Sequence, residues 1–570
     1  MRREARDLLI LLAIPSIVLL CAVLLGASAG PYWLGPNYDA AYQYLMNGLY
    51  LVKGFPPTHV DHPGTPVQML CALVIGVFNI GRPAAGTVDR VLIAPEFYLH
   101  AVFAVLVILS FLTSVLLAAY VYRRTRNKLA ALLVQLPALG FLVLPAGSTS
   151  APIIPVAVHV TPEPCLIVAM NLFNYALLRA FFAATPSEMT LAMAVWGVVC
   201  GLAAAVKLTF LPLMVVPLIV LGWRDKILFL VVSVGAFLVW TIPIFSRYPY
   251  LWQWASGILT HTGIHGAGGA GFIDLKSFFM NFLVIARQQG AVVFLALAGL
   301  GWAAARAIGR KADRATFFLA ATACGILLQF MAVAKHPGVH YLVPGLGLSG
   351  AFFVFLYLQR PLPARWKKVL AGAIFITVAA GTAQALVYRT QLEGYTRDVM
   401  AFHARVREKY NACVVIPYYG ASGQDVALSF GDGSYMVPRF AAEMARLYPD
   451  SIFLHLWSAR IMAFDFKARL WSDDLLAQSR CVVLDGIDYD FSPWPLQVQA
   501  LEKGPSESLY RVTGTLEQQA AIAFSSASRA LQAGDGARAL EFAAQARQLH
   551  FQPAVALERL TRQALAVARP

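Results

Sequence analysis

The stretch that decides the fold is residues 190–223, TLAMAVWGVVCGLAAAVKLTFLPLMVVPLIVLGW. It is apolar almost throughout, and its one charged residue is Lys207. Apolar runs of this kind cross the ~30 Å hydrocarbon layer of a bilayer as helices. The stretch could form one long helix or two short spans that meet near Lys207, and the charges of the loops that follow decide between them.

The composition of the whole chain agrees with a membrane location. Of 570 residues, 59% are apolar and 13% are charged, and the mean hydropathy is +0.64. These values exclude an ordinary soluble globule and a disordered chain. The net charge of +15 does not indicate nucleic-acid binding, because the basic residues cluster beside apolar runs and therefore act as topology signals.

The apolar runs predict an α-helical polytopic membrane protein with about eleven transmembrane helices. The first run extends from Leu8 to Ala29, after Met1-Arg2-Arg3. We interpret it as a retained span, although the GASAG sequence at its end resembles a signal-peptide cleavage site. The other predicted spans are 99–121, 129–146, 164–183, 190–206, 208–223, 227–246, 288–306, 316–334, 341–359 and 368–388.

Loop charge supports this count. With a cytoplasmic N-terminus, eleven spans place four basic clusters on the cytoplasmic side, where Lys and Arg are enriched in short loops. A span at 66–80, or one long helix over 190–223, would move the later clusters to the wrong side. We therefore predict a surface helix over 64–80 and two short spans meeting near Lys207. The four clusters are 123–128, 224–226, 306–314 and 360–368.

The chain changes character after about residue 389. We predict a transmembrane domain over 1–388 with surface helices in the outer loop 30–98, a soluble α/β domain over 389–515, and a tetratricopeptide-like helical segment over 516–570. Two short β-branched runs, 414–416 and 482–484, directly follow Cys413 and Cys481. If these runs pair as neighbouring parallel strands in an oxidising compartment, the two cysteines would form a disulfide.

The first outer loop contains a predicted amphipathic helix. Asp39, Gln43 and Asn47 recur at i, i+4 and i+8 and form a polar stripe. Such a helix lies in the membrane interface and would present a carboxylate at the membrane surface. The alternative is that Asp39 is only an acidic residue favoured at a helix start by the macrodipole.

Four further elements follow in a defined order. His59–Pro66 (HVDHPGTP) opens the second surface helix, Thr161–Pro164 (TPEP) begins a span, Gly201–Lys207 is a glycine-initiated stretch that ends in lysine, and Lys335–Pro344 (KHPGVHYLVP) opens a late span. With Asp39, this order resembles the GT-C superfamily of integral membrane glycosyltransferases, near the protein mannosyltransferases and the aminoarabinose transferases. The resemblance covers roughly residues 1–390.

The resemblance implies a catalytic chemistry. Members move a sugar from a polyprenyl-phosphate carrier to an acceptor at the outer membrane face, so Asp39 would be the general base. Many members have two adjacent acids in this loop, whereas Ala40 follows Asp39 here. Glu163 is therefore the candidate second catalytic carboxylate. Lys207 and Lys335 are candidate cations for the departing phosphate, although snorkelling to the interface would also explain each lysine.

Histidines and one tyrosine complete the candidate substrate-binding set, which comprises His62, Lys207, His261, His265, Lys335, His340 and Tyr341. Residues 261–269 are glycine-rich and could close over a substrate, but they could equally be a solvated loop with incidental histidines. A divalent metal would require three or four converging ligands, which sequence separation alone does not establish. We assign no metal and no other cofactor.

The sequence therefore predicts an inverting hexosyl- or pentosyltransferase of the inner (plasma) membrane. Its N-terminus would be cytoplasmic, and its active site and C-terminal domain periplasmic. Its partners would be a polyprenyl-phosphate sugar donor, membrane lipid, and a glycan, lipid or protein acceptor. The alternative is a transporter or flippase for a lipid-linked or small solute, which would place polar groups and broken helices near the bilayer midplane.

Overall fold

The computed structural model describes most of the chain and divides it into two compact units. Unit 1 comprises 1–30, 43–81 and 96–393, and unit 2 comprises 31–42, 82–95 and 394–570. The described residues are 2–34, 41–144, 154–260, 271–335, 338–418, 423–433, 438–455, 460–464, 468–469, 481–491, 498–512, 516–548 and 554–568.

Unit 1 is a helical membrane domain. Within the described residues, nine helical segments are long and apolar enough to cross a membrane, and shorter apolar helices accompany them. The nine are α1 (Arg2–Ser28), α5 (Pro95–Thr125), α8 (Pro162–Phe182), α9 (Pro186–Val206), α11 (Trp223–Thr241) continuing through η5 (Ile242–Arg247) and α12 (Tyr248–Thr260), α14 (Gly290–Ile308), α15 (Arg314–Lys335), η6 (Val339–Leu342) with α16 (Val343–Leu358), and α17 (Ala364–Lys409).

Two of the predicted spans are short and broken. The predicted span 129–146 contains α6 (Lys128–Leu133) and α7 (Pro137–Gly140), and the predicted span 208–223 contains the 3₁₀ helix η4 (Leu208–Met214) and α10 (Val215–Val220). Prolines cause these breaks because proline lacks the backbone N–H that an interior helical turn requires. The described residues thus contain nine long candidate spans where the sequence predicts about eleven, and these two predicted spans are shorter apolar helices. The predicted fold class, an α-helical polytopic membrane protein, is confirmed.

The last helix extends further than the sequence predicts. The apolar run ends near residue 388, but α17 continues to Lys409. Residues 389–409 are polar and include many good helix formers, so hydropathy marks the end of the span but not the end of the helix. The remaining unit 1 helices are α2 (Ala41–Val52, shared with unit 2), α3 (Thr65–Phe78), η3 (Val156–Val158) and α13 (Leu275–Gln288).

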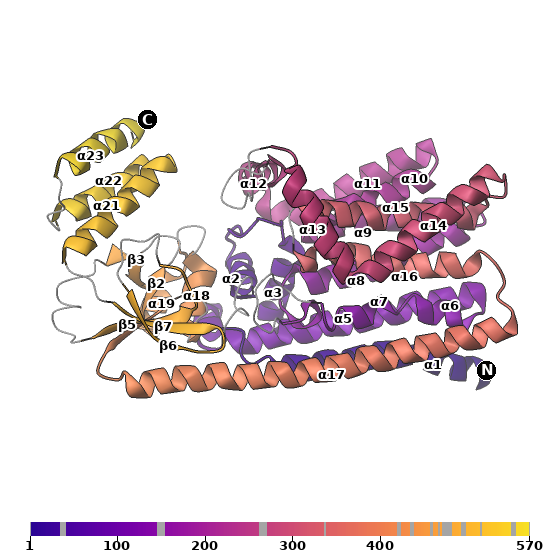
Figure 1. Ribbon diagram of the computed structural model, residues 1–570, viewed down its shortest axis with the longest axis horizontal. Helices are drawn as coiled ribbons and strands as arrows, with labels where there is room; N and C mark the ends of the chain where they lie inside the picture. Colours follow the sequence, from indigo (N-terminus) through magenta and orange to yellow (C-terminus); the bar gives the residue numbers. More distant parts are fainter. Residues whose placement is uncertain are drawn as a thin grey trace. The chain divides into compact units, whose positions relative to one another are not determined.

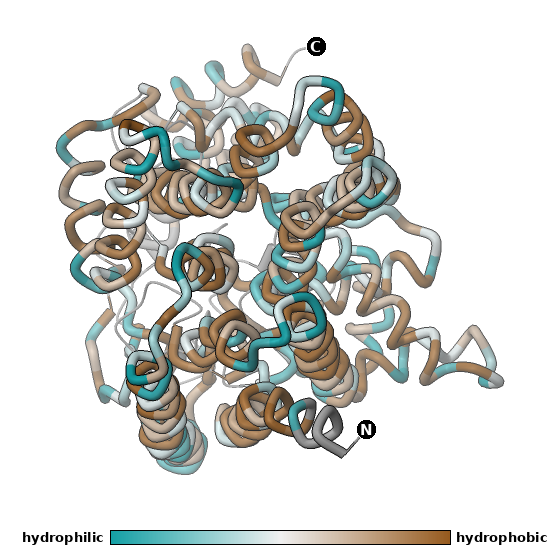
Figure 2. Tube along the Cα trace, turned by 90° about the vertical axis from the view of Figure 1, so that its right-hand side faces the viewer, coloured by the Kyte–Doolittle hydropathy of each residue, from teal (hydrophilic) through white to brown (hydrophobic). Residues whose placement is uncertain are grey.

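The basic loops of unit 1 lie at one end of the helix bundle. The α5–α6, α10–α11, α14–α15 and α16–α17 connections are at the same end as the N-terminus (Figure 1). Seen from that side, hydrophilic residues gather in the connections while the helix walls are mostly hydrophobic (Figure 2). At this end, the Asp7 carboxylate accepts hydrogen bonds from Lys128 Nζ at 2.9 Å and from the Tyr122 hydroxyl at 2.7 Å. The predicted grouping of the four basic clusters is therefore confirmed.

Small residues bring α9 and α11 close together. A Cβ atom added at Gly201 would lie 2.5 Å from Ser233 O and 2.6 Å from Phe237 N, both on α11. At Gly197, one turn earlier, an added Cβ atom would lie 2.8 Å from the Val232 side chain. Glycines spaced by four residues let helix backbones approach in membranes. The glycine of the Gly201–Lys207 stretch therefore lets α9, which ends directly before Lys207, pack closely against α11.

Unit 2 contains a four-stranded sheet with the order β1-β5-β7-β6 and a three-stranded sheet with the order β2-β3-β4. β1 and β5 are parallel, with Val414 opposite Val482, and a disulfide joins Cys413 to Cys481. The predicted strands and their disulfide are thus confirmed. The strands are β1 (Val414–Pro417), β2 (Ile452–His455), β3 (Arg460–Ala463), β4 (Ala468–Arg469), β5 (Val482–Ile487), β6 (Val498–Lys503) and β7 (Glu507–Val512).

Helices cover the sheet and end the chain. The C-terminal part of α17 packs Phe402 and Val406 against Val483 and Leu509 on one sheet face. Three alanine-rich helices share a separate small core. These three are α21 (Leu516–Gln532), α22 (Gly536–Gln548) and α23 (Ala554–Ala568); the other unit 2 helices are η2 (Ala84–Gly86), α4 (Thr87–Ile93), α18 (Gln424–Gly433) and α19 (Ala441–Leu447).

Candidate active site

The site is built around Lys207, where the long helix α9 ends. Lys207 has an extended backbone conformation, and η4 begins at the next residue. Its side chain is only 3% exposed. Burying a lysine inside a membrane domain costs free energy unless its ammonium group is paired. The residues that contact Lys207 therefore define the site.

Glu163 is the first of these partners. Lys207 Nζ donates a hydrogen bond to Glu163 Oε1, and Glu163 is 2% exposed. Glu163 lies in the first turn of α8, where the helix macrodipole favours a negative charge. The two predicted site residues, which are 44 positions apart in the chain, therefore form a buried ion pair.

The late motif supplies an aromatic wall. Lys207 Nζ lies 4.5 Å from the centre of the Tyr341 ring, within the range of a cation–π interaction. The His340 ring packs against the Tyr341 ring in a tilted arrangement, with centroids 4.0 Å apart. Gln329 of α15 donates a hydrogen bond to the Tyr341 carbonyl at 2.8 Å, which fixes η6 in place. His340 and Tyr341, both predicted, are thus part of the same cluster.

The first outer loop reaches the same lysine through its backbone. Pro63 and Lys207 form an isolated antiparallel bridge, and Leu208 N donates to His62 O at 3.0 Å. The His62 ring packs edge-on against Trp254, with centroids 5.2 Å apart. Gly64 adopts φ +70, and a Cβ there would lie 2.6 Å from the Tyr44 ring. Glycine is needed at this turn into α3 because other residues rarely adopt that backbone conformation.

The polar stripe of α2 supports this loop and does not face solvent. Gln43 and Asn47 are each 1% exposed. Asn47 Oδ1 accepts hydrogen bonds from Thr58 N at 2.5 Å and from His59 N at 3.1 Å, and Gln68 Nε2 donates to His59 O at 2.5 Å. The expectation of a helix with its polar side at the membrane surface is wrong for these two residues, because both are buried and the Asn47 amide bonds the loop backbone.

Lys335 lies apart from the cluster. Its ammonium group donates a hydrogen bond to Leu259 O and is 4.1 Å from the centre of the Phe272 ring. The described residues show no contact between Lys335 and the Glu163–Lys207 pair. Asp39, His261 and His265, the three other predicted site residues, lie outside the described residues.

Two buried residues near the site were not singled out by the sequence analysis. Asp61 is 3% exposed and interacts electrostatically with Tyr250, and His159 is 4% exposed and interacts with Glu163. Asp61 lies inside the HVDHPGTP motif, directly before His62, and His159 lies four residues before Glu163. This proximity in the sequence could have identified both. No group of three or more metal-ligating side chains occurs within the described part of the chain.

His159 gives the site a predicted acid sensitivity. Burial lowers the pKa of His159 to about 4 from its ordinary 6.5, and the nearby Glu163 charge opposes this shift. The unfolded chain therefore binds more protons than the native chain between these values, so stability falls as the pH drops from about 6.5 to 4. We expect the free energy of unfolding to fall less on acidification in His159→Gln than in the parent, by up to about 3 kcal/mol. Unfolding in detergent at pH 7.5 and 4.5 measures this difference.

The control for this prediction is His100→Gln, because His100 has a half-exposed side chain. That variant should keep the parent's loss of stability on acidification. If His159→Gln and the parent lose equal stability between the two pH values, His159 does not stay neutral in the native state and the prediction fails.

Comparisons with known proteins give structural matches alone. No family model and no curated protein matches the chain. The chain is similar to ArnT from Cupriavidus metallidurans in the apo state, with 14% identity, a TM-score of 0.46, and coverage of 87% of this chain and 97% of that one. It is similar to the same protein bound to undecaprenyl phosphate, with 15% identity, a TM-score of 0.47 and the same coverage.

A third similar structure is the apo oligosaccharyltransferase of Archaeoglobus fulgidus. It is 14% identical, with a TM-score of 0.37, and the match covers 74% of this chain and 64% of that one.

Proposed function

We propose that this chain is an inverting glycosyltransferase of the GT-C type. It would move a sugar from a polyprenyl-phosphate carrier to an acceptor at the outer face of the membrane. The observation that supports this most directly is the convergence on Lys207 of three sequence elements, which are the His62-Pro63 turn, Glu163, and His340-Tyr341. These are the elements whose order in the chain resembles that of the superfamily.

The ammonium group of Lys207 is suited to stabilise a departing phosphate. An ammonium group has three N–H donors, and one is directed at Glu163. The remaining donors can bind the oxygens of the departing polyprenyl phosphate, whose negative charge grows as the sugar–oxygen bond breaks. Glu163 would act as a positioning residue that holds Nζ in place, with Tyr341 as the opposite wall. His62 and His340 would contact the sugar or phosphate.

Asp39 is the proposed general base. It would take the proton of the acceptor hydroxyl or amine while that atom attacks the anomeric carbon. The phosphate then leaves with the electron pair of the broken bond, and this single displacement inverts the configuration. A carboxylate has a suitable basicity only when partial burial raises its pKa toward neutrality, which a pocket at the membrane edge can provide.

The C-terminal unit supports the outer placement. A disulfide joins Cys413 to Cys481, and disulfides persist in oxidising compartments rather than in the cytosol. Within unit 1, the basic loops lie together at the end of the helix bundle that also bears the N-terminus (Figure 1). With those loops cytoplasmic, the positive-inside rule is satisfied.

A transfer assay tests the proposal. The purified full chain in lipid nanodiscs would be given undecaprenyl-phosphate-linked hexoses and pentoses together with a membrane extract as the source of acceptor. We expect one donor to be consumed with release of undecaprenyl phosphate. If well-folded protein binds none of these donors, the proposal fails. If it moves donors across a vesicle bilayer without cleaving them, the protein is a flippase.

A further inference from the structure

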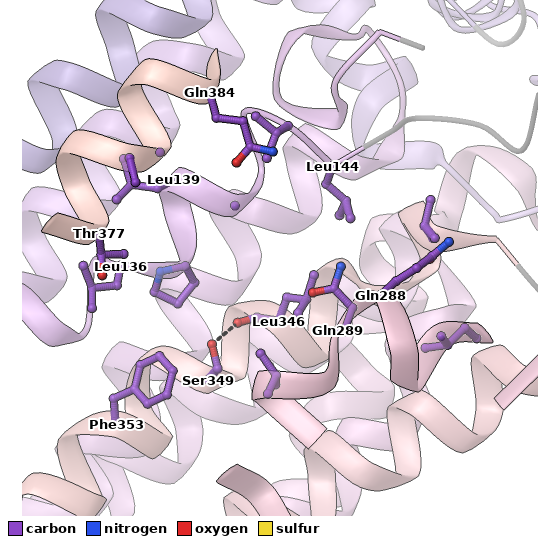
Figure 3. A pocket seen from close by; sticks show the side chains of 18 of the residues that line it. Leu136, Leu139, Leu144, Gln288, Gln289, Leu346, Ser349, Phe353, Thr377 and Gln384 are labelled. Atoms are coloured by element: carbon purple, nitrogen blue, oxygen red, sulfur yellow. Dashed lines mark hydrogen bonds between the residues drawn. The ribbon is translucent and has the colours of Figure 1, made fainter. Parts of the chain in front are cut away.

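A large cavity in unit 1 is distinct from the Lys207 cluster. Its volume is about 1040 Å³, and it lies among α7, α13, α14, α16 and α17 (Figure 3). Thr377 and Gln384 of α17 border it, as do Leu139 of α7 and Phe353 of α16. This volume exceeds what a single side chain would fill and is at the upper end of the range of small-molecule pockets.

The cavity opens toward the bilayer. Ile376 and Val284 both line it and are 66% and 52% exposed, respectively. Ile376 belongs to the candidate span Ala364–Lys409, so its exposed surface faces hydrocarbon and not water. A molecule that enters beside these residues therefore comes from the membrane, and it must carry apolar chains.

The lining is nevertheless partly polar. Gln288 and Gln289 lie at the break between α13 and α14, and Gln384 approaches from α17 on the other side (Figure 3). None of these three amides forms a hydrogen bond within the described part of the chain. Side-chain amides in a largely apolar lining are costly without partners. At a helix break they can bind a molecule that occupies the cavity. The amides can bind hydroxyl and ester groups.

The described lining contains no charged side chain and no histidine. An anionic head group would therefore be buried without a counter-ion, which is strongly unfavourable. The cavity consequently suits an uncharged lipid, with acyl chains against Leu139 and Phe353 and hydroxyl or ester groups at the three glutamines. A polyprenyl phosphate, whose one polar group is anionic, does not use these amides.

One short element connects the cavity to the candidate active site. Gly338 and Val339 line the cavity. Tyr341, two residues further along η6, lies beneath the Lys207 ammonium group. A lipid held in the cavity would therefore contact the same short element that contacts Lys207, and its polar end can approach the site along this element.

We propose that this cavity binds the acceptor, and that the acceptor is an uncharged, hydroxyl-bearing acyl lipid that enters from the bilayer. This inference rests on the proposed glycosyltransferase function. In the transfer, the lipid hydroxyl oxygen bonds to the anomeric carbon and gives its proton to the general base. The polyprenyl phosphate departs with the electron pair of the broken bond.

Photo-crosslinking of the full chain in nanodiscs tests the proposal. The probe is a diacylglycerol with a diazirine in one acyl chain. We expect label on peptides that line the cavity, and about tenfold less in the double variant Gln289→Leu/Gln384→Leu, which removes two hydrogen-bonding groups. The matched control is Gln391→Leu, an exposed glutamine of the same helix outside the cavity, which should label like the parent.

A second pair of variants guards against misfolding. Thr377→Trp fills the cavity mouth and should also abolish labelling, whereas Thr390→Trp, on the same helix and likewise hydrogen-bonded to a carbonyl four residues earlier, should not. Equal labelling of parent and cavity variants overturns the proposal. So does displacement of the probe by undecaprenyl phosphate, which would assign the cavity to the donor. Both outcomes contradict only the assignment of the cavity to the acceptor. The proposed glycosyltransferase function stands as long as the protein still binds undecaprenyl phosphate.

Discussion

Replacing Lys207 by methionine should abolish transfer and destabilise the protein. Glu163 would remain in a buried position without its partner, and removing one member of a buried ion pair typically costs about 3–5 kcal/mol. The double variant Lys207→Met/Glu163→Gln removes both charges and should recover most of that stability. We expect the double variant to remain inactive, with a rate reduced by about 10²–10³, because no ammonium group would stabilise the departing phosphate. Denaturant unfolding and the transfer assay measure the two effects separately.

This comparison separates a structural ion pair from a catalytic one. If the Glu163–Lys207 pair only joins α8 to the end of α9, the double variant will fold and transfer sugar at the parent rate, and the catalytic assignment is then wrong. The matched control is Lys503→Met. Lys503 also pairs with a carboxylate, Asp488, but its side chain is 71% exposed, so its loss should change neither activity nor, by more than about 1 kcal/mol, stability.

The membrane architecture could be predicted from the sequence because its signals are local. Each span is a run of apolar residues, and basic clusters mark the loops on one side of the membrane. No knowledge of distant contacts was therefore needed. The break at Lys207 followed from the same charge test, and the structure ends α9 at Val206. The disulfide between Cys413 and Cys481 was predictable because both cysteines immediately precede β-branched runs that pair in register.

The candidate site could be predicted only in part, because its geometry depends on contacts between distant segments. The sequence predicted Glu163, Lys207, His340 and Tyr341 as site residues, but nothing in their spacing indicated that their side chains lie in one cluster. Lys335 had an equally suitable sequence setting, yet it contacts Leu259 and Phe272.

The polar stripe of α2 shows the same limit. Its periodicity correctly indicated a helix, but the stripe is buried because Asn47 binds the backbone of the loop at Thr58 and His59. Periodicity shows which residues share a helix face, and it does not show whether that face meets water or another segment.

Asp39→Asn should reduce the rate of transfer by about 10²–10⁴, which is the usual contribution of a general base. Asparagine has nearly the same shape but does not accept the acceptor's proton at neutral pH. Donor binding should be unchanged, because our proposal assigns the binding of the phosphate to Lys207 and not to Asp39. The measurement compares kcat and the binding of undecaprenyl phosphate for the parent and the variant, and the matched control is Asp89→Asn, which alters a partly exposed carboxylate of the same loop that pairs with Arg446.

The choice of asparagine also tests the structural alternative for Asp39. Asparagine and aspartate are nearly equivalent as residues at a helix start, and the loss of a favourable charge there changes stability by at most about 1 kcal/mol. If Asp39 only stabilises the beginning of α2, the variant will transfer sugar at nearly the parent rate. A large loss of kcat in a protein that unfolds at the parent's denaturant concentration has no explanation in helix stability, because the helix would still be formed. That result would require the Asp39 carboxylate to take part in the reaction itself.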